Sequence, residues 1–126
     1  MTDMGIFRTT IAISRDFPAI RVGTLENAMV DTGAEYSWIP SSLLEDLGIA
    51  RVKVMRFVTA DGRISERSAG YGFVHAAGEA SPTVLIFAEP GDQTLLGAHD
   101  LKGMNLRVDL VEKRLIPAGP VSAAAA

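Results

Sequence analysis

The stretch Met29-Val30-Asp31-Thr32-Gly33-Ala34 determines how the rest of this sequence can be interpreted. The apolar-rich residues 25–30 predict a strand, so Asp31 is delivered to a loop at the end of that strand. Gly33 allows a sharp backbone turn in the loop, and its amide can point at the carboxylate. Thr32 offers a hydroxyl that can reach across to a facing loop. The stretch therefore predicts a carboxylate held in a shaped turn.

A carboxylate of this kind can hydrolyse a peptide bond when it is paired with a second one. Two carboxylates about 3 Å apart share one proton, because both cannot ionise together. The ionised partner takes a proton from a water between them, and the protonated partner donates a hydrogen bond to the scissile carbonyl oxygen. The sequence contains a single Asp-Thr-Gly, so the second carboxylate would come from the Asp31 of another copy. This hypothesis therefore requires a homodimer.

Outside this stretch, most of the sequence predicts short β-strands. The segments are rich in apolar and β-branched residues and are bounded by turn residues. Residues 83–88 form a continuous apolar run, which is typical of a strand buried on both faces. Gly23 and Thr24 are expected to form a tight connection between two strands. The predicted strands cover residues 7–13, 20–22, 25–30, 52–60, 63–74, 83–88, 105–110 and 114–117.

Two short helices and a hairpin are predicted between these strands. In the first helix Ser42 and Glu45 have capping-box spacing, and Gly48 is in position to end the helix. The second helix covers about residues 99–102. The hairpin has its tip at Ala60-Asp61-Gly62, where Asp-Gly is a pair that favours a two-residue turn.

These features together resemble the retropepsin-like (retroviral-type) aspartic proteases, in particular their small bacterial members. The matching segments are residues 29–34, the hairpin at residues 60–62, and Leu95-Leu96-Gly97 followed by Ala98-His99-Asp100-Leu101. The resemblance spans about residues 5–117. It implies an all-β fold, namely a retropepsin-like acid-protease barrel with a flap hairpin, one or two short helices and one lobe per chain.

The resemblance also implies an aspartic endopeptidase that acts as a homodimer on a polypeptide substrate, with the flap closing over an extended segment. It assigns the catalytic loop to Asp31, Thr32 and Gly33. It places Glu35 where family members contact the substrate main chain, and Trp38, with its neighbours Ser37 and Ile39, where they line a side-chain pocket. The substrate-binding residues that it predicts are Ala34, Glu35, Trp38, Ala60, Asp61 and Gly62.

The bulk composition argues against several other classes of protein. The absence of cysteine rules out disulfides and thiolate chemistry. A net charge of −3 argues against nucleic acid or an anionic membrane as a partner. His75 and His99 are lone histidines without metal-ligand spacing, so neither a metal site nor a cofactor is predicted.

The length and the ends of the sequence give further expectations. The 126 residues provide room for one core, so residues 1–119 are predicted to form a single domain and residues 120–126 a disordered tail. No apolar run approaches the roughly 18 residues that a membrane span needs. The first residues lack the basic stretch and apolar core of a secretory signal. The expected location is therefore the cytoplasm.

Each signal also has a simpler interpretation. Asp31 could cap a turn, the hairpin at residues 60–62 could be an ordinary surface hairpin, Glu35 could be solvated, and Trp38 could belong to the core. The alternative functions are a catalytically weak dimeric module that binds a peptide or protein on the same fold, and a non-enzymatic small barrel with a chance motif.

Overall fold

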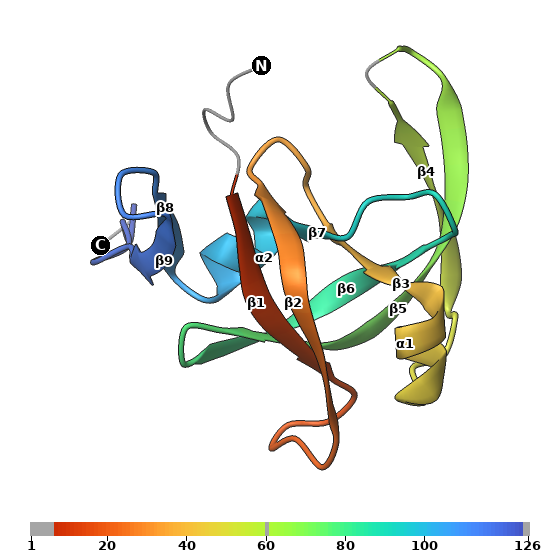
Figure 1. Ribbon diagram of the computed structural model, residues 1–126, viewed down its shortest axis with the longest axis horizontal. Coiled ribbons are helices and arrows are strands. Elements are labelled where there is room, and N and C mark those ends of the chain that lie inside the picture. The colour runs from red at the N-terminus through yellow and green to blue at the C-terminus, as the bar shows by residue number, and fades with distance from the viewer. Residues whose placement is uncertain (1–6, 60, 125–126) are drawn as a thin grey trace.

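The computed structural model describes residues 7–59 and 61–124. This part of the chain is mostly β-strand, with two short helices (Figure 1). The elements in chain order are β1 (Phe7–Ser14), β2 (Val22–Asp31), β3 (Ser37–Pro40), α1 (Ser41–Asp46), β4 (Lys53–Val58), β5 (Ile64–Ala76), β6 (Glu79–Ala88), β7 (Leu95–Gly97), α2 (Ala98–Gly103), β8 (Leu106–Asp109) and β9 (Arg114–Pro117).

Seven of the strands form one sheet that closes on itself. Their order is β1-β2-β7-β3-β6-β5-β4, and β8 and β9 form a separate two-stranded sheet. An additional antiparallel pairing joins β1 to β5. Every strand of the larger sheet except β4 therefore belongs to a closed ring, and β4 is attached to β5 outside it (Figure 1). The predicted all-β class and the predicted barrel with an attached hairpin are confirmed.

The long strand β5 belongs both to the ring and to the projecting hairpin. Its residues 64–69 pair with β4, whereas residues 69–76 pair with β6. Residues 73–75 also pair with β1, on the other side of β5. The hairpin formed by β4 and β5 is thus a continuation of the ring, and it rises beside the end of β2 in Figure 1.

The core lies inside the ring, where alternate residues of each strand point inward. Burying a side chain of this kind stabilises the fold by roughly 1.5–3 kcal/mol relative to leaving it in water. Leu44 of α1 and Leu101 of α2 extend the same cluster. No helix in the described part of the chain is long and apolar enough to cross a membrane. The buried ring residues are Phe7, Ile11, Ile13, Ala28, Val30, Ile39, Val74, Ala76, Leu85, Phe87 and Leu96.

Two local predictions near the first helix are wrong. Strand β2 is continuous, so the connection expected at Gly23 and Thr24 is absent; Gly23 is instead buried within the strand against the side chain of Leu43. The capping box of α1 is not formed either, because the helix has no side-chain cap hydrogen bond and Ser42 is exposed. The predicted helix end is confirmed, since Gly48 has a left-handed φ of +78°.

The hairpin tip also differs from the predicted two-residue turn. The amide of Gly62 donates to the carbonyl of Thr59, and the amide of Thr59 donates to the carbonyl of Arg63. Thr59 and Arg63 therefore pair across the tip, which lies at the predicted position, and Gly62 has a φ of +85°. Ala60 lies outside the described residues.

Candidate active site

Asp31 is the last residue of β2 and is held by the turn that follows it. The amide of Gly33 donates a hydrogen bond of 2.9 Å to Oδ1 of Asp31. The amide of Ala34 donates to the carbonyl oxygen of Asp31 at 3.1 Å, which closes the turn. Asp31 is half-buried, whereas Thr32 and Gly33 are exposed. The carboxylate is therefore fixed in orientation while its second oxygen remains available.

The second motif of the sequence lies directly beside the first. β2 and β7 run parallel, and their register pairs Asp31 with Gly97. A side chain at Gly97 has no room, because a Cβ there would lie 2.5 Å from the carbonyl oxygen of Tyr36 and 3.0 Å from that of Ala34. Because residue 97 is a glycine, the turn after β2 can pack onto β7, the neighbour of β2 in the sheet.

Helix α2 anchors the same turn from the other side. The amide of Ala98 donates to the carbonyl of Ala34 at 2.8 Å, and the amide of His99 donates to the carbonyl of Glu35 at 2.9 Å. These amides belong to the first turn of α2, which lacks partners within the helix. The helix thereby satisfies its own orphan donors and holds the residues just after Asp31.

A buried carboxyl lies behind this arrangement. Asp100 of α2 is fully buried, and the hydroxyl of Ser37 donates a hydrogen bond to its Oδ2. Ser37 in turn accepts a hydrogen bond of 3.0 Å from the amide of Gly97. Burial raises the pKa of Asp100, and the side chains of Ser37 and Thr83 and the charge of His99 oppose this rise.

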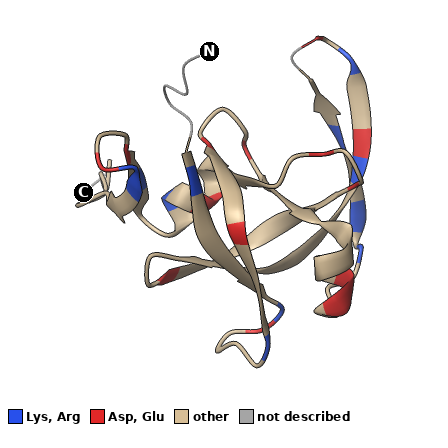
Figure 2. Ribbon diagram, viewed as in Figure 1, with Lys and Arg blue, Asp and Glu red and all other residues tan. Residues whose placement is uncertain are grey.

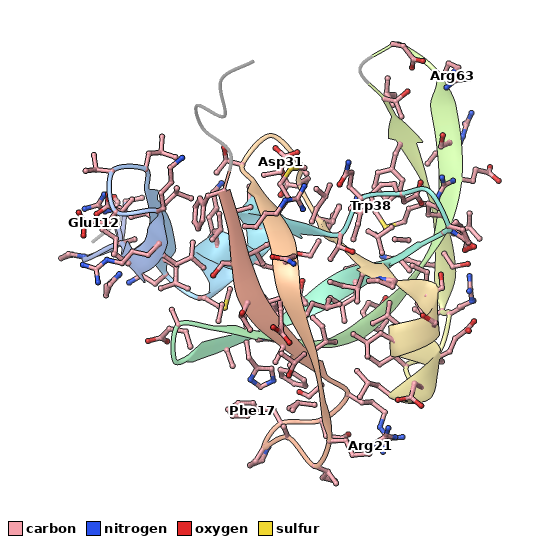
Figure 3. All side chains as sticks on the ribbon, viewed as in Figure 1. Phe17, Arg21, Asp31, Trp38, Arg63 and Glu112 are labelled. Carbon is pink, nitrogen blue, oxygen red and sulfur yellow. The ribbon has the colours of Figure 1, made fainter. Side chains whose placement is uncertain are left out.

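The Asp31 turn opens into a cleft of about 610 Å³. One wall comes from β2, β3 and the turn between them, and the other comes from β4 in the projecting hairpin. The ring of Trp38 on the first wall contacts the ring of Phe57 on the second, with their centroids 4.9 Å apart. Figure 3 shows Asp31 and Trp38 on the side of the molecule from which the hairpin carrying Arg63 rises. The lining residues are Asp31, Gly33, Ala34, Glu35, Tyr36, Trp38, Phe57, Val58, Thr59, Gln93 and Leu95.

The base of the hairpin is tied to the body of the protein by an ion pair. Arg67 of β5 donates to Asp92 through Nε at 2.7 Å and through Nη2 at 2.9 Å. The hydrogen bond from Arg67 lowers the pKa of Asp92, and the same contact raises the pKa of Arg67. The guanidinium also lies 5.7 Å from the centroid of the Trp38 ring. The hairpin is thus fixed where it meets the cleft wall.

Residues 21–99, more than half of the chain, match the family described as aspartyl protease. This chain belongs to the aspartyl protease family. The matched segment includes the Asp31 turn, the hairpin and the Leu95-Leu96-Gly97 strand. No curated protein matches the sequence.

A solved structure supports the fold of this chain. It is the crystal structure of the retroviral protease-like domain of Ddi1 from Leishmania major, which is 19% identical in sequence with a TM-score of 0.53. The match covers 90% of this chain and 90% of that chain. The chain therefore has the retropepsin-like fold that its sequence predicted.

The predicted site residues fall into two groups. Asp31, Gly33, Ala34, Glu35 and Trp38 line the cleft together. The remaining ones do not line it: Thr32 is exposed beside the cleft, Asp61 and Gly62 lie at the hairpin tip, and Ala60 is outside the described residues. The carboxylate of Asp61 accepts hydrogen bonds from within the hairpin, from Thr59 and from the amide of Arg63.

Several residues of the cleft were not predicted from the sequence. Phe57 could have been found from the period-two pattern of β4, in which Met55 and Phe57 are the less exposed residues. Leu95 belongs to a recognised motif, but its partial exposure beside the buried Leu96 was not assigned to the cleft. Tyr36, Gln93 and Thr59 carry no local signal, because loop and turn geometry brings them there.

Positive and negative side chains alternate along the β4–β5 hairpin (Figure 2). Arg56 lies 4.0 Å from Glu66, and Arg63 lies 2.9 Å from Asp61, with all four side chains largely in water. Exposed pairs of this kind contribute about 0–1 kcal/mol each. They form a solvated face of the hairpin, whereas Arg67 at the base is half-buried.

Proposed function

We propose that this protein is an aspartic endopeptidase, which hydrolyses peptide bonds with a water activated between the two Asp31 carboxylates of a homodimer. The observation that carries the proposal is the position of Asp31. It sits at the head of a cleft, held by the amide of Gly33 and facing a hairpin strand. An extended polypeptide could lie in this cleft between the Asp31 turn and β4.

The homodimer follows from the chemistry of the proposed reaction. One carboxylate cannot both take a proton from water and donate a hydrogen bond to the carbonyl oxygen. The hydroxyl of Thr32 is exposed and makes no hydrogen bond to the residues that the structure describes. It is therefore available to a facing turn, which supports a pairing of two Asp31 turns about a two-fold axis.

The test is digestion of a mixed peptide library between about pH 4 and pH 8, followed by mass spectrometry. Asp31→Asn keeps the shape of the side chain and should lower the cleavage rate by about 10²–10⁴-fold. Asp46→Asn is the matched control, because Asp46 is an exposed carboxylate on α1, paired with Arg21 and outside the cleft. The control should cleave as the unsubstituted protein does, and circular dichroism should show all three proteins folded.

Three outcomes would contradict the proposal. Cleavage by Asp31→Asn at the normal rate would exclude the shared-proton mechanism. Peptides that bind to the unsubstituted protein and stay intact would indicate the binding module instead. Treatment with a chelator should leave the rate unchanged, because the proposed water is activated by carboxylates; a rate lost to the chelator and restored by zinc would also exclude the mechanism.

A further inference from the structure

The buried carboxyl of Asp100 is a costly feature that the proposed reaction does not use directly. Asp100 is 0% exposed, and its Oδ1 has no hydrogen-bond partner among the described residues. An apolar side chain of similar size would avoid the loss of hydration that a buried carboxyl suffers. Asp100 does not line the cleft. A role of Asp100 in the active site must therefore act through a neighbouring residue.

A short chain of hydrogen bonds connects Asp100 to the strand beside Asp31. Ser37 is also fully buried, and its hydroxyl donates to Oδ2 of Asp100. The same hydroxyl oxygen accepts the amide hydrogen of Gly97 at 3.0 Å. Gly97 lies next to Asp31 in the register of β2 and β7. The chain therefore runs from the core to the strand that flanks the catalytic turn.

We propose that Asp100 is a positioning residue of the peptidase site, which holds the Gly97 amide beside Asp31 through the Ser37 hydroxyl. Asp100 orients the Ser37 hydroxyl as a donor, so that the oxygen of Ser37 presents a lone pair to Gly97. The position of Gly97 fixes β7, and β7 fixes the end of β2. The effect of this positioning on hydrolysis rests on the proposed function.

The neutral acid is the form of Asp100 that suits this role. Around α2, strands β3 and β7 carry no titratable side chain, β6 carries Glu79, and β8 carries Arg107 and Asp109. On α2 itself are His99 and Lys102, and His99 supplies the charge that acts on the carboxyl. His99 is exposed, so its charge is screened by water. An ionised Asp100 would leave an unpaired charge in the core, so the fold favours the neutral acid.

The first experiment measures the Gly97 amide by NMR in full-length chains that also carry Asp31→Asn, which removes the titration of Asp31. The Gly97 amide should shift as Asp100 titrates, and this shift should be absent in Asp100→Asn, which mimics the neutral acid. Ser37→Ala and Asp100→Leu should speed hydrogen exchange at Gly97 by about tenfold or more. Leu101→Val is the matched control, because it removes one methylene from the same helix and leaves the chain of hydrogen bonds intact.

The second experiment compares peptide hydrolysis in the same variants without the Asp31 substitution. Asp100→Leu and Ser37→Ala should lower kcat by about tenfold with little change in KM, because the cleft walls are intact but Asp31 is displaced. Asp100→Asn should keep kcat near that of the unsubstituted protein, because its amide oxygen can accept the hydrogen bond from Ser37. Leu101→Val should lower stability only.

The two experiments separate failure of this inference from failure of the proposed function. Exchange at Gly97 that is as slow in Ser37→Ala and Asp100→Leu as in the Leu101→Val control would overturn the positioning role. So would a kcat that is equal in Asp100→Leu and Asp100→Asn. If no peptide is cleaved but the Gly97 amide follows Asp100 as described, the proposed hydrolysis fails and the structural link between Asp100 and Gly97 stands.

Discussion

Gly97 is the residue whose substitution should disturb the site most directly. Gly97→Ala places a Cβ 2.5 Å from the carbonyl oxygen of Tyr36, and this backbone is held by its neighbours on α2 and β3. We expect a loss of about 1–3 kcal/mol in the free energy of unfolding, together with a fall in kcat, because the strand beside Asp31 must move. Urea denaturation and peptide hydrolysis measure the two effects.

Gly78→Ala is the control for this substitution. Gly78 has a φ of +80° and open space around it, so alanine there should cost about 1 kcal/mol through backbone strain alone. The hairpin between β5 and β6 that contains Gly78 does not line the cleft, so kcat should not change. Equal effects of the two substitutions on kcat would contradict the tight packing inferred at Gly97.

Asp100 should make the stability of the protein depend on pH in an unusual direction for a carboxyl. Its pKa is raised by burial from the ordinary value of 3.8, so the folded state binds the proton more tightly than the unfolded chain does. Stability is then complete below the ordinary pKa and falls as the pH rises through the raised one. We expect Asp100→Asn to remove this fall, as measured by urea denaturation at a series of pH values. A pH profile that is unchanged in Asp100→Asn would show that Asp100 does not titrate as described.

At the scale of elements, the base of the β4–β5 hairpin should respond to pH in the opposite direction. The Arg67 guanidinium lowers the pKa of Asp92, so the pair stabilises the fold above the ordinary carboxyl pKa of 3.8. This stabilisation is lost as the pH falls through the lowered value. With both side chains about four-fifths buried, Asp92→Asn should cost about 1–2 kcal/mol near neutral pH and little in strong acid.

The exposed pair of Arg21 and Asp46 is the control for that ion pair. Its side chains are 61% and 70% exposed, so Asp46→Asn should cost less than about 0.5 kcal/mol at any pH. Urea denaturation of both variants near neutral pH and in acid checks the difference. An Asp92→Asn variant as stable as Asp46→Asn would show that the base of the hairpin is not held by this contact.

The elements that local sequence could predict are those with strong short-range signals. Segments rich in apolar and β-branched residues between turn residues predicted β1 and the hairpin strands, and Gly48 marked the end of α1. The prediction failed where tertiary packing overrides local chemistry. Gly23 does not break β2, because its missing side chain makes room for Leu43. The hydroxyl of Ser41 binds the carbonyl of Ala88 on β6, so α1 is anchored by the sheet and not by a capping box.

Only those parts of the candidate site that belong to sequence motifs could be predicted. The Asp-Thr-Gly stretch placed Asp31 and its turn, and Leu95-Leu96-Gly97 was recognised as its counterpart. The pairing of Asp31 with Gly97 and the contact between Trp38 and Phe57 join residues far apart in the chain. No local pattern encodes such contacts, since they arise only when the ring closes. The same is true of the hydrogen bond between Ser37 and Asp100.

At the scale of the whole molecule, the proposed dimer should make activity depend on concentration and on mixing. Below the dimer dissociation constant, activity per chain should fall on dilution. Mixing equal amounts of Asp31→Asn and unsubstituted chains should leave about a quarter of the dimers with two intact carboxylates. Activity per unsubstituted chain should then fall to about half, measured after the chains have exchanged. Activity that is unaffected by the added chains, or sedimentation as a monomer while peptides are cut, would contradict the shared dyad.

Because β4 lies outside the closed ring, the β4–β5 hairpin is held at its base and free at its tip, like a cantilever beam. β5 is held between β1 and β6 at residues 73–75, whereas the only strand that pairs with residues 64–68 in the described part of the chain is β4. A beam that is clamped at one end deflects most at its free tip, so the hairpin can swing without separating any strand of the ring. The stiffness of the hairpin is set at its base, by Arg67, Asp92 and the contact between the tilted rings of Trp38 and Phe57. Substitutions there can tune how readily the cleft opens while the closed ring continues to carry the stability of the fold.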